Sequence, residues 1–120
     1  MPVVSAVDQA LTNTDKGPAG THLDELVIVT GSAAGSRFEL VKEITSVGRH
    51  EESDLLLDDV SVSRHHALFT RTASGRVTLR DLNSLNGTYV NGTRVEETTL
   101  HSADEVQIGK YKLVFWEATV

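Results

Sequence analysis

The 120-residue chain contains no cysteine, which excludes disulfide bonds, thiolate zinc sites and a cysteine nucleophile. It has no apolar run near the roughly 18 residues that a membrane-spanning helix needs. Its first residues lack the basic stretch and apolar segment of a secretory signal. We therefore expect a protein that acts in the cytoplasm, with no membrane partner.

Basic residues are scarce, because 11 lysines and arginines stand against 17 aspartates and glutamates, giving a net charge of −6. A nucleic-acid-binding protein normally carries a basic surface that displaces counterions from the phosphate backbone. The acidic balance therefore argues against a nucleic-acid partner. A single phosphate group is a different ligand, since salt screens distant charges over about 8 Å and a local pocket can still hold one anion.

The first part of the chain, residues 1–22, has the composition of a flexible tail. It is rich in Ala, Thr, Asp and Gly, and the stretch Lys16–Gly20 breaks regular structure. Thr12 and Thr14 are the candidate kinase targets within it. The alternative interpretation is that the whole segment is a solvated linker.

After the tail, short apolar runs alternate with turn residues. The strict alternation over residues 77–80 is typical of a half-buried strand, and Asn91-Gly92 is a strong hairpin signal. Strands are expected near residues 26–29, 38–40, 44–47, 55–57, 67–70, 77–80, 88–90, 93–95, 106–108 and 113–116. This pattern predicts an all-β fold, a β-sandwich of about eleven short strands without helices.

One folded domain is expected over residues 23–117, with residues 118–120 as the C-terminal end. Within it, the glycine-rich segment 31–36 is interpreted as a hairpin turn. It lacks the lysine and the glycine spacing of a phosphate-binding loop.

Three polar clusters stand where apolar runs stop: Gly48-Arg49, Ser63-Arg64-His65-His66 and Asn83-Ser84-Leu85-Asn86-Gly87. A phosphomonoester near pH 7 carries about −1.5 to −2 charges and three strong acceptor oxygens. Arg49 offers a planar fork for two of those oxygens, Ser63 offers a hydroxyl, and Arg64 offers a second cation. Backbone N–H groups near Leu85 and Asn86 are further donors. We therefore predict an anion site whose ligand is a phosphate carried by another protein.

Each of these residues also has a plainer interpretation. Arg49 could pair with Glu51 or Glu52 on the surface. Ser63 could cap a turn, and Asn86-Gly87 could be only a hairpin turn.

The ordered set Gly48-Arg49, Ser63-x-x-His66 and Asn86-Gly87 resembles the forkhead-associated (FHA) domain, a phosphothreonine reader. The longer segments VGRHEESDLLLDDVSVSRHHALF and SLNGTYVNG are similar to the family of the actinobacterial glycogen accumulation regulator and oxoglutarate dehydrogenase inhibitor. The resemblance covers about residues 26–116. It implies an FHA-type β-sandwich that acts in signalling as a phosphothreonine-dependent binding module rather than as an enzyme, and that needs no cofactor.

The resemblance also implies residue roles. The phosphothreonine-binding residues would be Arg49, Ser63, Arg64, Leu85 and Asn86. The residues that shape the site would be Gly48, His66, Ser84 and Gly87. Threonine would be preferred to serine through contact with its methyl group.

The partners that the resemblance implies are a Ser/Thr protein kinase and phosphothreonine-containing proteins, with 2-oxoglutarate dehydrogenase or glutamate dehydrogenase among them. In the family, a phosphorylated tail threonine docks on the domain's own pocket. This chain has only Leu11–Asp15 where the relatives carry a Glu-Thr-Thr-Ser-Val-Phe-like motif. Binding to another protein is therefore favoured over self-inhibition, and a monomer is expected.

Two rival functions remain at this stage. A hydrolase could use Ser63 and His66 with Asp58 or Asp81, although no nucleophile-elbow motif is present. The histidines show no recognised metal-ligand spacing, so no metal site is expected. An FHA-fold scaffold that binds partners without phosphate is the second rival.

Overall fold

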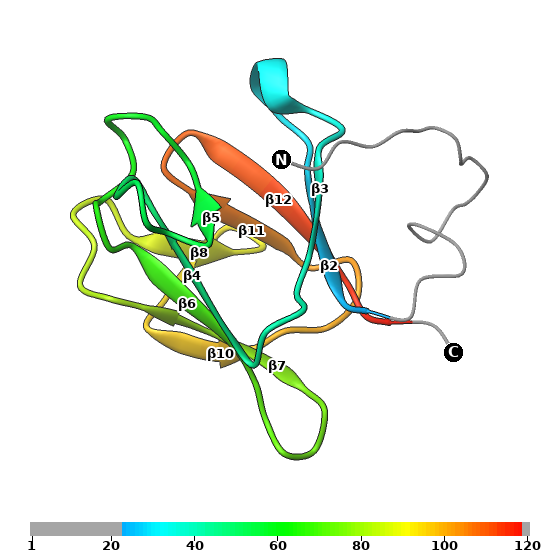
Figure 1. The fold of residues 1–120 in the computed structure, drawn as a ribbon. Helices are drawn as coiled ribbons and strands as arrows, with labels where there is room; N and C mark the ends of the chain where they lie inside the picture. Colours follow the sequence, from blue (N-terminus) through cyan, green and yellow to red (C-terminus); the bar gives the residue numbers. More distant parts are fainter. Residues whose placement is uncertain (1–22, 119–120) are drawn as a thin grey trace.

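The computed structural model describes residues 23–118, which form two β-sheets and one short 3₁₀ helix (Figure 1). The strands are β2 (Glu25–Ile28), β3 (Arg37–Glu39), β4 (Ile44–Gly48), β5 (Leu55–Leu56), β6 (Ala67–Arg71), β7 (Val77–Asp81), β8 (Thr88–Val90), β9 (Thr93–Val95), β10 (Glu97–Thr99), β11 (Glu105–Ile108) and β12 (Tyr111–Trp116). The predicted all-β architecture of about eleven short strands is therefore confirmed.

The strands divide into a five-stranded sheet in the order β10-β7-β6-β4-β5 and a six-stranded sheet in the order β3-β2-β12-β11-β8-β9. All neighbouring strands in these sheets are antiparallel except β4 and β5, which are parallel. Short antiparallel strands joined by tight turns place every second side chain between the two sheets. The fold is a β-sandwich, as its strand pattern predicts.

The core contains aliphatic side chains and two phenylalanines from both sheets. Phe69 and Leu79 enter it from the five-stranded sheet, and Phe115 and Leu26 from the six-stranded sheet; each is at most 1% exposed. The alternation predicted over residues 77–80 is present, with Val77 and Leu79 buried, Thr78 half-buried and Arg80 exposed. Burial of apolar surface at roughly 25 cal/mol per Å² is the main force that holds these sheets together.

Two local features differ from the sequence-based expectation. Strand β10 has the sequence Glu-Thr-Thr, which carries no apolar residue, yet it pairs with β7 as the edge of the five-stranded sheet. An edge strand with solvent on one side needs little apolar character. The predicted turn over 31–36 contains a 3₁₀ helix at Gly31–Ala33, so the prediction of no helix misses one short helical turn.

The strand directions bring the three polar clusters to one end of the sandwich. The loops that follow β4, precede β6 and follow β7 gather on the left side of Figure 1, away from the turn between β6 and β7. Residues 49, 63 and 86, which are far apart along the chain, thus belong to neighbouring loops.

Candidate functional site

The first two polar clusters run alongside each other as a backbone-bonded pair of segments. The N–H of Arg49 donates to the carbonyl of Ser63 over 3.0 Å, and the N–H of His50 donates to the carbonyl of Arg64 over 3.1 Å. These two bonds join the loop after β4 to the loop before β6. Arg49 and Ser63 are thereby held in fixed register.

Gly48 is required by this close approach. A Cβ atom at Gly48 would lie 2.0 Å from the carbonyl oxygen of Arg64 and 2.8 Å from its carbonyl carbon. Gly48 is not among the glycines with positive φ, so the requirement is for space rather than for an unusual backbone conformation. Only glycine lets the two loops approach this closely.

The side chain of Arg49 is oriented by a backbone carbonyl. Its Nε donates to the carbonyl of Val62 over 3.0 Å. The two terminal nitrogens of the guanidinium have no partner among the described residues, and neither Glu51 nor Glu52 forms an ion pair with Arg49. The surface salt bridge considered for Arg49 is therefore not formed, and two planar donors remain available.

The hydroxyl of Ser63 receives a hydrogen bond from the third cluster. The backbone N–H of Leu85 donates to Ser63 Oγ over 2.9 Å. A hydroxyl whose oxygen accepts one bond still has its own proton to donate. The N–H of Leu85 thereby orients the Ser63 hydroxyl, and the role of Leu85 in binding phosphothreonine stays a prediction.

His66 is fully buried and bonds both to the loop before β6 and to the turn after β7. Its Nδ1 accepts the backbone N–H of Ser63 over 3.0 Å, and its Nε2 lies 2.9 Å from the carbonyl oxygen of Gly87. An amide N–H can only donate and a carbonyl can only accept, so the proton is on Nε2. This geometry does not suit the hydrolase alternative, because Nδ1 faces the amide of Ser63 and not its hydroxyl.

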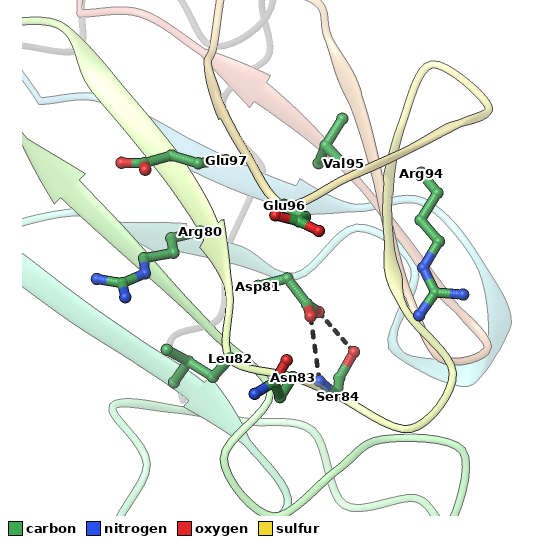
Figure 2. Close-up of a pocket in the computed structure, with 9 residues that line it drawn as sticks. All are labelled: Arg80, Asp81, Leu82, Asn83, Ser84, Arg94, Val95, Glu96 and Glu97. Atoms are coloured by element: carbon green, nitrogen blue, oxygen red, sulfur yellow. Dashed lines mark hydrogen bonds between the residues drawn. The ribbon is translucent and has the colours of Figure 1, made fainter.

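Ser84 closes the turn of the third cluster through Asp81. Figure 2 shows the Asp81 carboxylate turned toward Ser84, whose N–H and Oγ both donate to it. The Oγ of Thr88 also donates to Asp81, and the N–H of Gly87 donates to Ser84 Oγ. Burial acts to raise the pKa of Asp81, but the bonds from Ser84 and Thr88 outweigh it and hold the pKa below its ordinary value.

Asp81 and Thr88 are site-supporting residues that the sequence interpretation did not single out. Asp81 was considered only as a possible triad member. The Asp-x-x-Ser spacing of Asp81 and Ser84 is the signal that could have found them, since an aspartate side chain readily bonds the backbone a few residues further on.

Asn86 is joined to the loop before β6 through Ser61. Its Nδ2 donates to the carbonyl of Ser61 over 3.0 Å, and this leaves its amide oxygen without a partner among the described residues. The Oγ of Ser61 donates to Asp59 over 2.6 Å and accepts the N–H of Lys110 over 2.8 Å. The hairpin between β11 and β12 therefore supports the binding loops from behind, a long-range contact that no local sequence pattern indicates.

Among the residues that support the binding loops, Asp59 has the most strongly shifted pKa. Hydrogen bonds from the hydroxyl and N–H of Ser61, and then from Lys110, lower the pKa of Asp59 to about 2. Asp59 also forms an ion pair with Lys110 at 3.1 Å, and that pair raises the pKa of Lys110. The carboxylate is thus charged at neutral pH and keeps its contacts with the loop.

Arg64 is exposed beside the site and has no partner side chain among the described residues. The residues that follow the two site arginines, His50 and His65, stack their rings with centroids 5.2 Å apart. The structure therefore brings the predicted binding residues to one end of the sandwich, with Arg64 at its edge.

The class of the domain is decided by its match to a known family. A family model of the FHA domain matches residues 45–109, which include all three polar clusters. The chain belongs to the FHA family. The predicted resemblance is confirmed over both the fold and the motifs that carry it.

Curated proteins similar to this FHA domain are bacterial regulators. The glycogen accumulation regulator GarA of Mycolicibacterium smegmatis is 47% identical over 114 residues, which cover 95% of this chain and 70% of that protein. The oxoglutarate dehydrogenase inhibitor of Corynebacterium efficiens is 50% identical over 106 residues, which cover 88% of this chain and 72% of that protein.

Solved structures with the same fold include FHA domains bound to phosphopeptides. EmbR of Mycobacterium tuberculosis, in complex with a low affinity phosphopeptide, matches with a TM-score of 0.74 and 28% identity over 82% of this chain and 25% of that one. A second match, from a structural and functional analysis of phosphothreonine-dependent FHA domain interactions, has the same TM-score and identity over 82% of this chain and 99% of that one.

Three further expectations concern metal ions, membrane spans and phosphorylation. In residues 23–118 no group of three or more potential ligands could hold a metal ion, and no helix is long and apolar enough to cross a membrane. The candidate phosphorylation sites Thr12 and Thr14 lie outside the described residues, so they stay predictions.

Proposed function

We propose that this FHA domain binds phosphothreonine segments of other proteins through Arg49, Ser63 and Asn86, with Arg64 as a further cation. The observation that carries the proposal is the orientation of two donors. Val62 holds the Arg49 guanidinium by its Nε, and Leu85 holds the Ser63 hydroxyl by its oxygen. Both side chains keep unused N–H or O–H groups and are fixed before any ligand arrives, which reduces the entropy lost on binding.

The donors suit a phosphate dianion in number and strength. The terminal nitrogens of Arg49 can bind two oxygens at once, and the Ser63 hydroxyl can bind a third. Three charge-assisted hydrogen bonds at roughly 1.5 to 3 kcal/mol each give roughly 5 to 9 kcal/mol. Micromolar affinity needs about 8 kcal/mol after the peptide has been ordered, so contacts with flanking residues must add to the phosphate.

Two exposed apolar side chains are in place to make those contacts. Val60 is 90% exposed and Leu85 is 83% exposed, the two highest values among the exposed large apolar side chains of the described residues. Val60 directly precedes Ser61, which binds Asn86, the neighbour of Leu85. We propose that this apolar rim contacts the threonine methyl group and the residues beside the phosphate.

The relatives support a proposal for the cellular role. We infer that the domain acts downstream of a Ser/Thr protein kinase and regulates central metabolic enzymes, with 2-oxoglutarate dehydrogenase or glutamate dehydrogenase as candidate partners. The inference is supported by the 50% identity to an oxoglutarate dehydrogenase inhibitor and by the phosphopeptide complex of EmbR.

Phosphothreonine peptides are first selected from an oriented library, in which the phosphothreonine is fixed and the flanking residues vary. Calorimetry then compares the affinities of Arg49→Ala and wild type for the selected peptides. We expect Arg49→Ala to weaken binding about 100-fold or more, because two charge-assisted bonds are lost. Arg76→Ala is the matched control, since Arg76 pairs with Glu117 rather than facing the site. The unphosphorylated peptide should not bind measurably.

Two results would reject the proposal. One is an Arg49→Ala variant that binds the phosphopeptide as tightly as wild type. The other is a wild-type protein that binds phosphorylated and unphosphorylated peptides equally, which would favour the phosphate-independent scaffold.

A further inference from the structure

A polar groove of about 760 Å³ opens on the flank of the turn that carries Leu85 and Asn86 (Figure 2). We call it the side groove; its charged and polar lining residues include Arg80, Asp81, Ser84, Arg94, Glu96 and Glu97. Figure 2 shows Arg94 and Arg80 at opposite ends of the groove, with the Asp81 carboxylate between them. Neither Arg80 nor Arg94 contacts the phosphate in the proposed binding mode.

Arg94 lies directly against the turn that carries Leu85, Asn86 and Gly87. A Cβ atom added at Gly87 would lie 2.8 Å from Arg94 Nε and 3.0 Å from Arg94 Cζ. The antiparallel pairing of β8 with β9 sets this position, because it places Thr88 opposite Val95, the neighbour of Arg94. The guanidinium therefore sits beside Gly87, two residues along the turn from the amide that binds Ser63.

Arg94 is also one of the few basic side chains without an acidic partner. Ten of the eleven lysines and arginines lie in residues 23–118, and six of those ten form ion pairs with carboxylates. The four described basic residues that do not are Arg49, Arg64, Arg80 and Arg94. In an acidic protein, unpaired arginines gathered near one site indicate that an incoming anion is their partner.

Asp81, one of the acids that line the groove, is not free to neutralise Arg94. The Asp81 carboxylate already accepts the N–H and hydroxyl of Ser84 and the hydroxyl of Thr88. Figure 2 shows it directed at Ser84 and not at Arg94. The Arg94 fork thus keeps its full capacity for a bidentate carboxylate contact.

We propose that Arg94 selects partners that carry one aspartate or glutamate close to the phosphothreonine. This rests on the proposed function and names its substrate class more narrowly. Arg94 lies beside Gly87, close to the turn whose Leu85 amide binds Ser63, so the carboxylate that reaches Arg94 belongs to a residue near the phosphothreonine in the peptide sequence. Glu96 and Glu97 also line the groove, and their charges repel a longer acidic run.

The experiment uses two phosphothreonine peptides that differ only by Asp or Asn at the acidic position selected by the oriented library. Wild type should bind the Asp peptide about two- to fivefold more tightly, the size expected of an exposed ion pair. Arg94→Gln should remove this preference while keeping wild-type affinity for the Asn peptide. Arg80→Gln, which removes an unpaired arginine from the far end of the same groove, should keep the preference.

Salt dependence and a conservative variant make the test sharper. The preference for Asp should shrink between low salt and 1 M salt, because screening weakens exposed charge pairs. Arg94→Lys should retain part of the preference, since it keeps the charge and loses the fork. Amide spectra of each variant must match the wild-type fold before the affinities are compared.

The failures of the two proposals are distinguishable. If wild type binds both peptides equally, or Arg94→Gln keeps the full preference for Asp, the role of Arg94 is wrong and phosphothreonine binding stands. If wild type binds no phosphothreonine peptide in the library, the proposed function is wrong and the role of Arg94 falls with it.

Discussion

The backbone N–H of Leu85 donates to the hydroxyl oxygen of Ser63 over 2.9 Å, although 22 residues separate them along the chain. This bond joins the loop before β6 to the loop after β7 at the centre of the site. It also fixes the direction in which the hydroxyl can donate, because one lone pair of its oxygen is occupied. The second polar cluster thus depends on the third for its orientation.

Ser63→Ala should lower phosphopeptide affinity with little effect on the fold. The variant loses one charge-assisted bond to phosphate, worth roughly 1.5 to 3 kcal/mol, so the affinity should fall about 10- to 100-fold. The freed amide of Leu85 is at an exposed position and water can take the place of the hydroxyl. Calorimetry measures the affinity and urea denaturation measures the stability.

Ser74→Ala is the matched control for this prediction, because Ser74 is an exposed serine in the turn between β6 and β7. It should bind as wild type does. A Ser63→Ala protein with undiminished affinity would show that the hydroxyl does not touch the phosphate.

His66→Ala should destabilise the whole domain. The substitution empties a fully buried site and leaves the amide of Ser63 and the carbonyl of Gly87 without partners. Together these effects should lower the free energy of unfolding by about 2 to 4 kcal/mol. His65→Ala is the control, since His65 is exposed and should change stability by less than about 1 kcal/mol. Equal stability of the two variants would contradict the bridging role of His66.

Much of this architecture could be predicted from the sequence, because local patterns determine it. Period-two alternation identified β7, and the Asn91-Gly92 turn identified the hairpin of β8 and β9. Strand β10 was missed because it is an edge strand with no apolar residue. An edge strand of this kind depends on the pairing partner that tertiary structure supplies.

The supporting contacts of the site were harder to predict, because they join residues that are distant in the chain. The bond from the Lys110 amide to Ser61 spans 49 residues. The contact of Arg94 with Gly87 depends on the register of a hairpin. A sequence motif reports which residue types are present, while the folded sheets decide which of them meet.

The loop that contains Ser61 should loosen in acid. Asp59 has its pKa lowered to about 2, so its contribution is present above its unfolded pKa of about 3.9 and is lost as the pH falls through about 2. Amide shifts of Ser61 and Lys110 should therefore change in two-dimensional NMR spectra with a midpoint near pH 2, the folded pKa of Asp59. Asp59→Asn should remove this transition, and an unchanged transition in that variant would assign it to another acid.

The pKa of Asp81 is also below its ordinary value, so protonation of Asp81 in acid lowers the stability of the domain as protonation of Asp59 does. The free energy of unfolding should fall as the pH is lowered from about 4. Urea denaturation at several pH values measures this, and stability that rises over that window would contradict the contribution of both aspartates.

Gly48→Ala should damage binding by moving the two loops apart. The new methyl group would lie 2.0 Å from the carbonyl oxygen of Arg64, a backbone atom that cannot turn aside as a side chain can. Displacing it moves Ser63 relative to Arg49, so phosphopeptide affinity should fall at least about tenfold even in the folded protein. The steric strain should also cost about 3 kcal/mol of stability, the upper end for overpacking.

Gly75→Ala separates this steric effect from the general effect of replacing a glycine. Gly75 has a φ of +88° and nothing within 4 Å of an added Cβ, so alanine there meets backbone strain without a clash. It should cost about 1 to 2 kcal/mol and leave affinity unchanged, since the turn between β6 and β7 is at the other end of the strands. If both variants keep wild-type affinity when folded, the close approach of Gly48 to Arg64 serves only the fold and not the alignment of Arg49 with Ser63.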